Sequence, residues 1–314
     1  MTTHRSIAHR LEAELDAFGL LLGPDEEVAA AADAAHRGRR LLSAALAVCY
    51  PGRDLVFEFE GEEVATRLQG ALAFGAATAA VFSPGEPAEG VELLCALFTL
   101  GIGLVDGLCD NEPEAGKQLL RLVQERSVAE AAEQRRGRGW LRSGVPPALA
   151  LDPTVVFAAD VVEAFFEMLH AVYPGGGWLP LRTTVGARLE AALEAERSSV
   201  DWSAQSAPRA QLIEWSRRTS VLPFEVVQIL AGGRETTAAT LLGEAVWRID
   251  DLVDLDQDAR TGALNAILVA GHEDLGPAAV EAAQKLSAGL QLAAGSSMLF
   301  LWFVQQYAGI QARS

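Results

Sequence analysis

Two clusters of aspartate side chains have the spacing of metal ligands. The first is the segment DGLCD, which contains Asp106 and Asp110, and the second is DDLVDLDQD, which contains Asp250, Asp254 and Asp258. In an α-helix, residues four apart lie on the same face, so each cluster forms a row of carboxylates. Stacked like charges destabilise a bare helix, whereas carboxylates that face each other across a helical cavity can hold Mg²⁺ together with the phosphates of a substrate.

The sequence before the first cluster favours a helix that is buried along one face. Residues 91–110 are apolar for about five turns and end in the two carboxylates. Pro113 restricts Glu112 and is expected to end this helix. The C-terminus of a helix disfavours anions because the dipole there is negative, unless those anions bind a cation. A solvated, acidic helix end is the alternative interpretation.

The second cluster continues an apolar face. The turns before it present small or apolar residues, as a cavity wall would: Ala239, Gly243, Val246 and Trp247. Asp251 flanks the row, and Gly262 is expected to end the helix. A surface stripe on an acidic protein is the alternative interpretation, but it does not explain the apolar continuation. An EF-hand is excluded because the acidic residues are on a helix and no glutamate closes a 12-residue loop.

The elements that position these residues are expected to be helices. Strand-like alternation is nearly absent apart from DLVFEF at 54–59, and the basic, glycine-rich stretch 134–147 is expected to be an exposed loop. The simplest architecture is one all-α domain spanning residues 1–314, with about ten helices. We expect helices near residues 5–22, 26–49, 62–82, 89–111, 114–134, 153–172, 180–198, 207–221, 224–257 and 276–311.

Composition narrows the classes of partner. The chain has 314 residues, and its 25 Lys and Arg against 42 Asp and Glu leave a net charge of −17. This charge argues against nucleic acid and anionic membrane surfaces and is compatible with cations. The longest nearly uncharged runs, 93–105 and 290–304, are shorter than the roughly 20 residues of a membrane span, so no integral membrane segment is expected.

The cysteines and the N-terminal segment indicate a cytoplasmic protein. Cys49, Cys95 and Cys109 lie in apolar segments without metal-site spacing, which is typical of reduced thiols. The first ten residues, MTTHRSIAHR, lead into a charged segment without the apolar core of a signal peptide.

The two acidic motifs resemble those of the class I isoprenoid synthases. DGLCD is similar to the DDxxD motif of that superfamily, with Gly107 in place of the second aspartate. DDLVDLDQDARTGALN resembles most the second metal motif of the bacterial large terpene synthases, typified by tetraprenyl-β-curcumene synthase. It is also similar to the second motif of squalene and phytoene synthases. The resemblance covers about 95–115 and 240–265, and it is specific for the superfamily but weak for the substrate.

The resemblance implies a single-domain helical bundle around a deep apolar cavity, with three Mg²⁺ ions that grip a prenyl diphosphate. Diphosphate leaves, and the carbocation cyclises or is captured by another prenyl unit. By this pattern Asp106 and Asp110 bind two ions, while Asp250, Asp254 and Asp258 bind the third. The neighbouring Asp251 is a further ligand or a supporting residue. Family members are often dimers, so a homodimer is expected by analogy alone.

A diphosphate also needs fixed positive charge. The first candidates are Arg217 and Arg218 in WSRRTS, a segment similar to the basic Lys-Thr element of prenyl synthases, with ordinary surface charge as the alternative. Arg260 follows the second motif and is a third candidate. The Arg-Tyr pair near the C-terminus of many terpene cyclases is absent, and Tyr307, which stands nearest to it, is a further candidate for contacting the diphosphate.

Aromatic residues in the apolar helices are candidates for stabilising a carbocation through their ring faces, or else belong to the core. Seven residues fall in this group: Phe98, Phe165, Phe166, Trp247, Phe300, Trp302 and Phe303.

Three hypotheses follow, the first being a Mg²⁺-dependent terpene synthase that acts on a linear prenyl diphosphate. The second is a prenyltransferase. Chain elongation normally needs a full DDxxD, which Gly107 breaks, whereas head-to-head coupling needs DxxxD in both motifs, which this chain has. The third is a non-catalytic helical protein with the same fold. The intact Asp254 and Asp258 argue against it, because a protein that had lost its function would no longer need an aspartate at either position.

Overall fold

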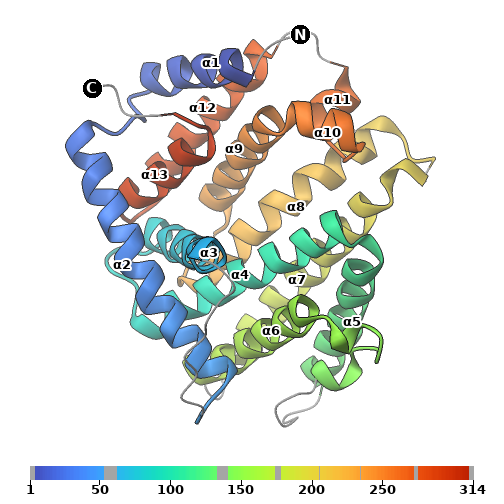
Figure 1. Cartoon of the computed structure of the whole chain (residues 1–314). Coiled ribbons are helices and arrows are strands. Elements are labelled where there is room, and N and C mark those ends of the chain that lie inside the picture. The colour runs from blue at the N-terminus through green and yellow to red at the C-terminus, as the bar shows by residue number, and fades with distance from the viewer. Residues whose placement is uncertain are drawn as a thin grey trace.

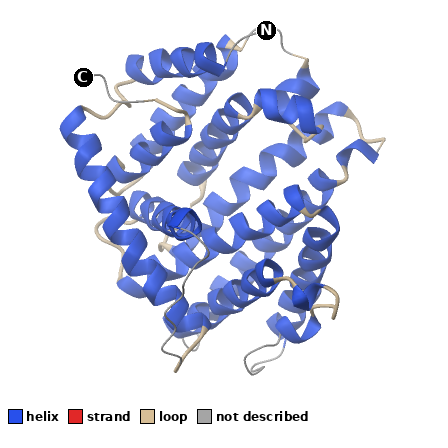
Figure 2. Ribbon diagram, viewed as in Figure 1, coloured by secondary structure: helices blue, strands red, loops and turns tan. Residues whose placement is uncertain are grey.

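The computed structural model describes residues 4–52, 62–132, 141–173, 178–204, 206–233, 235–271 and 275–310, and these ranges contain helices and no strand (Figures 1 and 2). The all-α class is therefore confirmed for this part of the chain. The segment 54–59, expected as the one strand-like stretch, and residues 134–140 of the expected basic loop lie outside the described residues.

Thirteen α-helices and three short 3-10 segments make up the described fold. The 3-10 segments are Arg142–Gly144, Leu149–Leu151 and Trp202–Ala204. The α-helices are α1 (His4–Ala17), α2 (Pro24–Cys49), α3 (Glu62–Phe82), α4 (Glu89–Asn111), α5 (Pro113–Ala132), α6 (Pro153–Val172), α7 (Trp178–Val200), α8 (Arg209–Leu230), α9 (Thr237–Val253), α10 (Leu255–Thr261), α11 (Ala266–Ala270), α12 (Gly276–Leu292) and α13 (Met298–Tyr307).

Helix α4 lies at the centre of the bundle. It packs against α3, α6 and α8, while α9 packs between α8 and α12, and α13 lies against α2 and α3 (Figure 1). A stretch of α4, Glu89–Cys109, is long and apolar enough to cross a membrane by length and composition, with a mean hydropathy of 1.9. Within the most apolar part of that stretch, 61% is buried in this fold. Buried core helices of soluble proteins can have the same length and composition.

The expected helix 224–257 is wrong in its bounds, because the chain breaks twice within it. Pro223 does not separate two helices but lies inside α8, which continues to Leu230. Gly232, with a φ of 94°, then turns the chain toward α9, and Asp254 separates α9 from α10. Proline removes one backbone hydrogen bond and kinks a helix, but burial of the surrounding turns of α8 outweighs that loss.

The expected helix 276–311 is also divided, into α12 and α13. The residues between α12 and α13 pack against the end of α3. There, the N–H group of Gly295 donates to the carbonyl of Val81 (2.9 Å), and that of Ser296 donates to the carbonyl of Ala80 (3.1 Å). A Cβ atom at Gly295 would lie 1.8 Å from the Ala80 oxygen, so only glycine permits this approach. The break thus satisfies carbonyls that the end of α3 leaves without a helical partner.

The two predicted helix ends next to the acidic motifs are confirmed. Helix α4 ends at Asn111, and Pro113 begins α5. Gly262 ends α10 in the left-handed conformation, with a φ of 77°. The first acidic motif therefore lies at the C-terminal end of α4, as the sequence predicted, whereas the second spans the last turn of α9 and the first turn of α10.

Candidate metal and substrate site

Asp106 of the first cluster and the aspartates of the second line one cavity, which we call the acidic cavity. It has a volume of about 630 Å³ and is bordered by residues of α4, α7, α8, α9, α10 and α13. Serine and threonine hydroxyls line it as well, among them those of Ser199, Ser216, Thr219 and Ser220. Its acidic lining residues are Asp106, Glu196, Asp250, Asp251, Asp254 and Asp258.

A second, apolar cavity of about 500 Å³ lies between α3, α4, α8, α9 and α13. Its side walls include Phe74, Ile102, Val227, Val246 and Ile249. The two cavities meet, because both are lined by the same five residues: Asp106, Thr219, Ser220, Asp250 and Tyr307. The apolar cavity, or chamber, therefore opens at one end into the acidic cavity. We call this shared end the mouth.

Gly243, predicted as part of the cavity wall, faces α8 instead. A Cβ atom there would lie 2.7 Å from the Cα of Val221, so glycine lets α9 approach α8 closely. Val246 and Ile249 form the part of the wall that α9 contributes. The face of α9 that precedes Asp250 therefore packs partly against α8 and partly lines the apolar cavity.

The row of three aspartates survives the break between α9 and α10. Asp254 is at the junction, with φ −92° and ψ 4°. Its N–H donates to the carbonyl of Asp250 at 2.9 Å, and the N–H of Asp258 donates to the carbonyl of Asp254 at 2.8 Å. Because the hydrogen bonds of an α-helix continue through the junction, the three side chains stay on one face.

Tyr307 lies against the row of aspartates, at the junction of the two cavities. Its phenolic oxygen lies 2.5 Å from Asp250 Oδ1 and 2.9 Å from Asp254 Oδ2. Burial raises the pKa of Asp250 to about 7, and the negative charges of Asp254, Asp106 and Asp258 add to this, while the hydrogen bond from Tyr307 opposes it. Burial and the adjacent carboxylates also raise the pKa of Tyr307, so the phenol keeps its proton.

Asp251 is buried beside the row, with only 3% of its surface exposed. Its Oδ1 accepts a hydrogen bond from the N–H of Ala266 at 3.2 Å, whereas its Oδ2 has no hydrogen-bond partner among the described residues and lies 3.9 Å from Arg248 Nη1. Burial raises the pKa of Asp251 to about 8, and the charge of Asp250 contributes. A buried oxygen without a partner is costly, and this one belongs to a residue that lines the acidic cavity, which fits a bound cation.

Asn265 holds the second motif in place, and the sequence analysis assigned it no role. Its Nδ2 donates to Asp258 Oδ2 at 2.8 Å and to the carbonyl of Asp251 at 2.9 Å. Its Oδ1 accepts from the N–H groups of Ile267 and Leu268 and so caps α11. The signal in the sequence was an asparagine between a helix-ending glycine and an apolar segment, which is an N-cap pattern.

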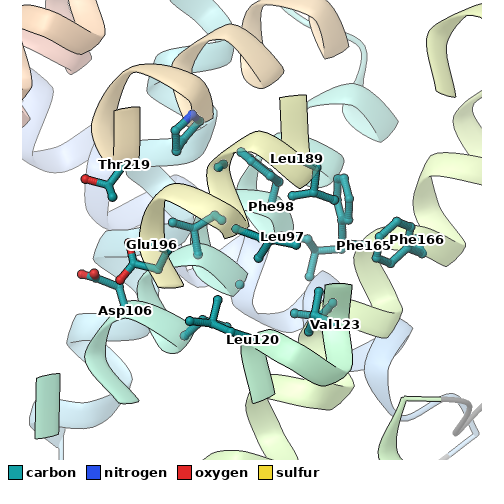
Figure 3. A pocket seen from close by; sticks show the side chains of 17 residues that line it. Leu97, Phe98, Asp106, Leu120, Val123, Phe165, Phe166, Leu189, Glu196 and Thr219 are labelled. Carbon is teal, nitrogen blue, oxygen red and sulfur yellow. The ribbon is translucent and has the colours of Figure 1, made fainter. Parts of the chain in front are cut away.

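Glu196 is a second residue that the sequence analysis missed. It comes from α7 and lines both the acidic cavity and a small cleft of about 50 Å³, which residues of α4, α5, α6, α7 and α8 enclose. Figure 3 shows its carboxylate beside that of Asp106 at the polar end of this cleft, with Phe165 and Phe166 at the apolar end. No motif marks Glu196, because it stands in an ordinary charged helix and is brought to Asp106 only by packing.

The first motif is described in part. Asp106 is exposed at the mouth of both cavities, and the side chain of Asp110 lies outside the described residues. Among the side chains that the structure describes, no three His, Cys, Asp or Glu residues converge closely enough to hold a metal ion by themselves. A Mg²⁺ site usually takes only one or two carboxylates for each ion, with water or substrate phosphates as its other ligands.

The three candidate arginines do not line either cavity. Arg217 donates to Glu214 at 2.8 and 2.9 Å and to Glu244 at 2.9 Å, so its guanidinium is engaged between α8 and α9. Arg218 is on the side of α8 opposite Ser216 and Ser220, which line the acidic cavity. Arg260 is exposed on α10.

Five of the seven aromatic candidates line one of these three spaces, whereas Phe300 and Trp302 line none of them. Phe303 lines the apolar cavity together with Phe74 and Phe224, which the sequence did not single out. Phe300 is fully buried behind them, with its ring 5.8 Å from that of Phe74 and 6.0 Å from that of Phe224. The remaining lining residues are Phe98, Phe165 and Phe166 in the small cleft and Trp247 in the acidic cavity.

No protein-family model matches this sequence, and a search of curated proteins found no match. The geometry and chemistry of the site itself are therefore the basis for assigning a function.

Proposed function

We propose that the protein is a Mg²⁺-dependent class I terpene synthase, which ionises a linear prenyl diphosphate, cyclises the carbocation and releases diphosphate. The observation that supports this most directly is the junction of the two cavities. An apolar chamber of about 500 Å³ shares Asp106 and Asp250 with an acidic cavity of about 630 Å³. A substrate with a hydrocarbon tail and a diphosphate head matches this division.

The apolar cavity suits the prenyl chain. Its volume is in the range of about 300–1,000 Å³ that is usual for small-molecule sites. Phe74, Phe224 and Phe303 place aromatic rings along it, and ring faces attract a cation. Apolar walls also exclude water, which would quench a carbocation early. These side chains would therefore fold the chain and protect the charge as it moves.

The acidic cavity suits the diphosphate only if cations are present, because its carboxylates would otherwise repel it. The residues that would hold the ions are Asp106 and Asp110 on α4, and Asp250, Asp254 and Asp258 on α9 and α10. Asp251 and Glu196 flank these two groups and are further candidates. Bound Mg²⁺ supplies neutralisation of the charge that develops on the leaving diphosphate.

Hydroxyl groups, and none of the three candidate arginines, line the junction of the two cavities. The roles of Arg217, Arg218 and Arg260 in binding diphosphate stay predictions, because none of these side chains lines either cavity. Thr219 and Ser220 already line both cavities, so their hydroxyls are near the diphosphate end of the chamber.

The sizes of the apolar spaces favour one substrate chain over two. Head-to-head coupling requires room for two prenyl chains, and the small cleft beside Asp106 has a volume of only about 50 Å³. Cyclisation requires only the larger chamber. Prenyl transfer therefore stays the second hypothesis, and a non-catalytic scaffold the third.

The test is incubation of the purified protein and Mg²⁺ with linear prenyl diphosphates of increasing length, with and without isopentenyl diphosphate, and with EDTA as the control. Diphosphate release and extracted products would be measured. A cyclic hydrocarbon or alcohol from one substrate alone is the expected result. A longer diphosphate that forms only with isopentenyl diphosphate would mean elongation, a doubled hydrocarbon would mean coupling, and no release from any substrate would favour the scaffold.

A further inference from the structure

Tyr307 contacts two carboxylates with a single hydroxyl. Its oxygen is within hydrogen-bond distance of both Asp250 Oδ1 and Asp254 Oδ2. A phenol has one proton and can donate to only one acceptor at a time. While both carboxylates are ionised, the second contact therefore lacks a proton, and the three oxygens form an arrangement that one cation would satisfy better than the phenol does.

The phenolic oxygen lies almost where a cation between the two carboxylates would lie. It is 2.5 Å and 2.9 Å from the two oxygens, whereas Mg²⁺ binds oxygen at about 2.0–2.1 Å. The difference is less than about one ångström on either side. The phenol and an ion bridging Asp250 and Asp254 therefore cannot be present together in this space.

We propose that Tyr307 is a placeholder for the metal ion: it holds Asp250 and Asp254 in a row while no cation is bound, and it is displaced when a cation binds between them. This inference rests on the proposed function for the role of the ion. It assigns Tyr307 as a positioning residue that lowers the affinity of the protein for the cation.

The position of Tyr307 allows this movement without unfolding. Tyr307 is the last residue of α13, and 45% of its surface is exposed. Val304 and Ile310 on either side are buried and anchor the segment. A rotation of the Tyr307 side chain is therefore enough to vacate the space, since its neighbours keep the backbone in place.

The first test compares cation binding by the wild-type protein and Tyr307→Phe, using calorimetry with Mg²⁺ alone and with Mg²⁺ plus inorganic pyrophosphate. Removal of the hydroxyl leaves the ring but no competitor, so about tenfold tighter binding is expected. Tyr50→Phe is the matched control, because Tyr50 donates to the buried carboxylate of Asp160 at 2.9 Å, and neither residue lines the cavities of the site. Its affinity for Mg²⁺ should equal that of the wild type.

A second test needs no change at Tyr307. The chain has three tyrosines, so protein labelled with 3-fluorotyrosine should give three ¹⁹F resonances. Tyr50→Phe and Tyr173→Phe assign two of them, and Tyr307 follows by elimination. Addition of Mg²⁺, alone or with pyrophosphate, should shift the Tyr307 resonance and leave the other two in place.

Equal or weaker cation binding by Tyr307→Phe, or a Tyr307 resonance that does not move, would overturn the inference. Absence of cation binding under both conditions would overturn it as well. None of these outcomes depends on turnover. Product formation from prenyl diphosphates, measured separately, decides the proposed function, so the two can fail independently.

Discussion

The side-chain amide of Asn265 donates a hydrogen bond to the carboxylate of Asp258 at 2.8 Å, and the same amide group binds the carbonyl of Asp251 at 2.9 Å. Asn265 is fully buried and also caps α11. One residue therefore ties the last carboxylate of the aspartate row to the backbone of α9 and to the start of the next helix. Its side chain fixes the orientation of Asp258 in a way that helix periodicity alone does not.

Replacement of Asn265 tests this connection. Asn265→Ala removes the cap and the hydrogen bond to Asp258, so we expect the free energy of unfolding to fall by about 1–3 kcal/mol. Asn265→Asp keeps an oxygen that can cap α11 but places a second carboxylate beside Asp258. Because the buried donor becomes an acceptor that faces Asp258 and the Asp251 carbonyl, this variant should lose at least as much stability in urea unfolding and bind Mg²⁺ differently from the wild type. Equal stability of the alanine variant and the wild type would contradict the connection.

Asp254→Ala should abolish Mg²⁺-dependent diphosphate release, with a loss of at least about 100-fold, and leave the protein folded. Asp254 lines the acidic cavity and contacts Tyr307, whereas Asp256, two residues on, is exposed on α10. Asp256→Ala is therefore the matched control and should keep full activity. The measurement is diphosphate release, with circular dichroism to verify folding. Unchanged turnover in Asp254→Ala would remove the metal role of the second motif.

Arg217→Ala should reduce stability more than it reduces ligand binding. The Arg217 guanidinium is engaged by Glu214 and Glu244, and Glu244 also contacts Lys285. We expect a loss of about 1 kcal/mol in unfolding free energy and an affinity for pyrophosphate, in the presence of Mg²⁺, within about twofold of the wild type. A large loss of pyrophosphate affinity without a loss of stability would instead support the diphosphate-binding role predicted from the sequence.

The stability of the metal-free protein should fall as pH rises from 6 to 8. The pKa of Asp250 is raised to about 7 and that of Asp251 to about 8, both by burial, so the folded protein holds these two protons more tightly than the unfolded chain does. That stabilisation is complete below the ordinary aspartate pKa of about 4 and is lost as pH rises through the folded values. A fall of about 1–3 kcal/mol is expected in EDTA.

The measurement is the unfolding midpoint in EDTA across this pH range, with Asp251→Asn as the control. The variant has no carboxyl group at position 251 to titrate, so its stability should vary less with pH. Mg²⁺ should restore stability most at pH 8, where the carboxylates are ionised. A midpoint of the metal-free wild type that rises with pH would contradict the prediction.

Several features followed from local chemistry and could be predicted. The all-α class follows from the abundance of helix-forming residues and the near absence of alternation. The rows of aspartates follow from the period of the helix, and the ends near Pro113 and Gly262 follow from the backbone preferences of proline and glycine. The same local rules failed at Pro223 and at the break before α13, where tertiary packing outweighs propensity.

The sequence by itself determined which residues could bind a cation, because that depends on residue type and spacing along one helix. Only the tertiary structure decided which of them meet. It brought Glu196 to Asp106, Tyr307 to Asp250 and Asn265 to Asp258, and it turned Arg217 toward Glu244 instead of the mouth. These relationships join residues of different elements, and they depend on how those elements pack, which helix periodicity alone does not encode.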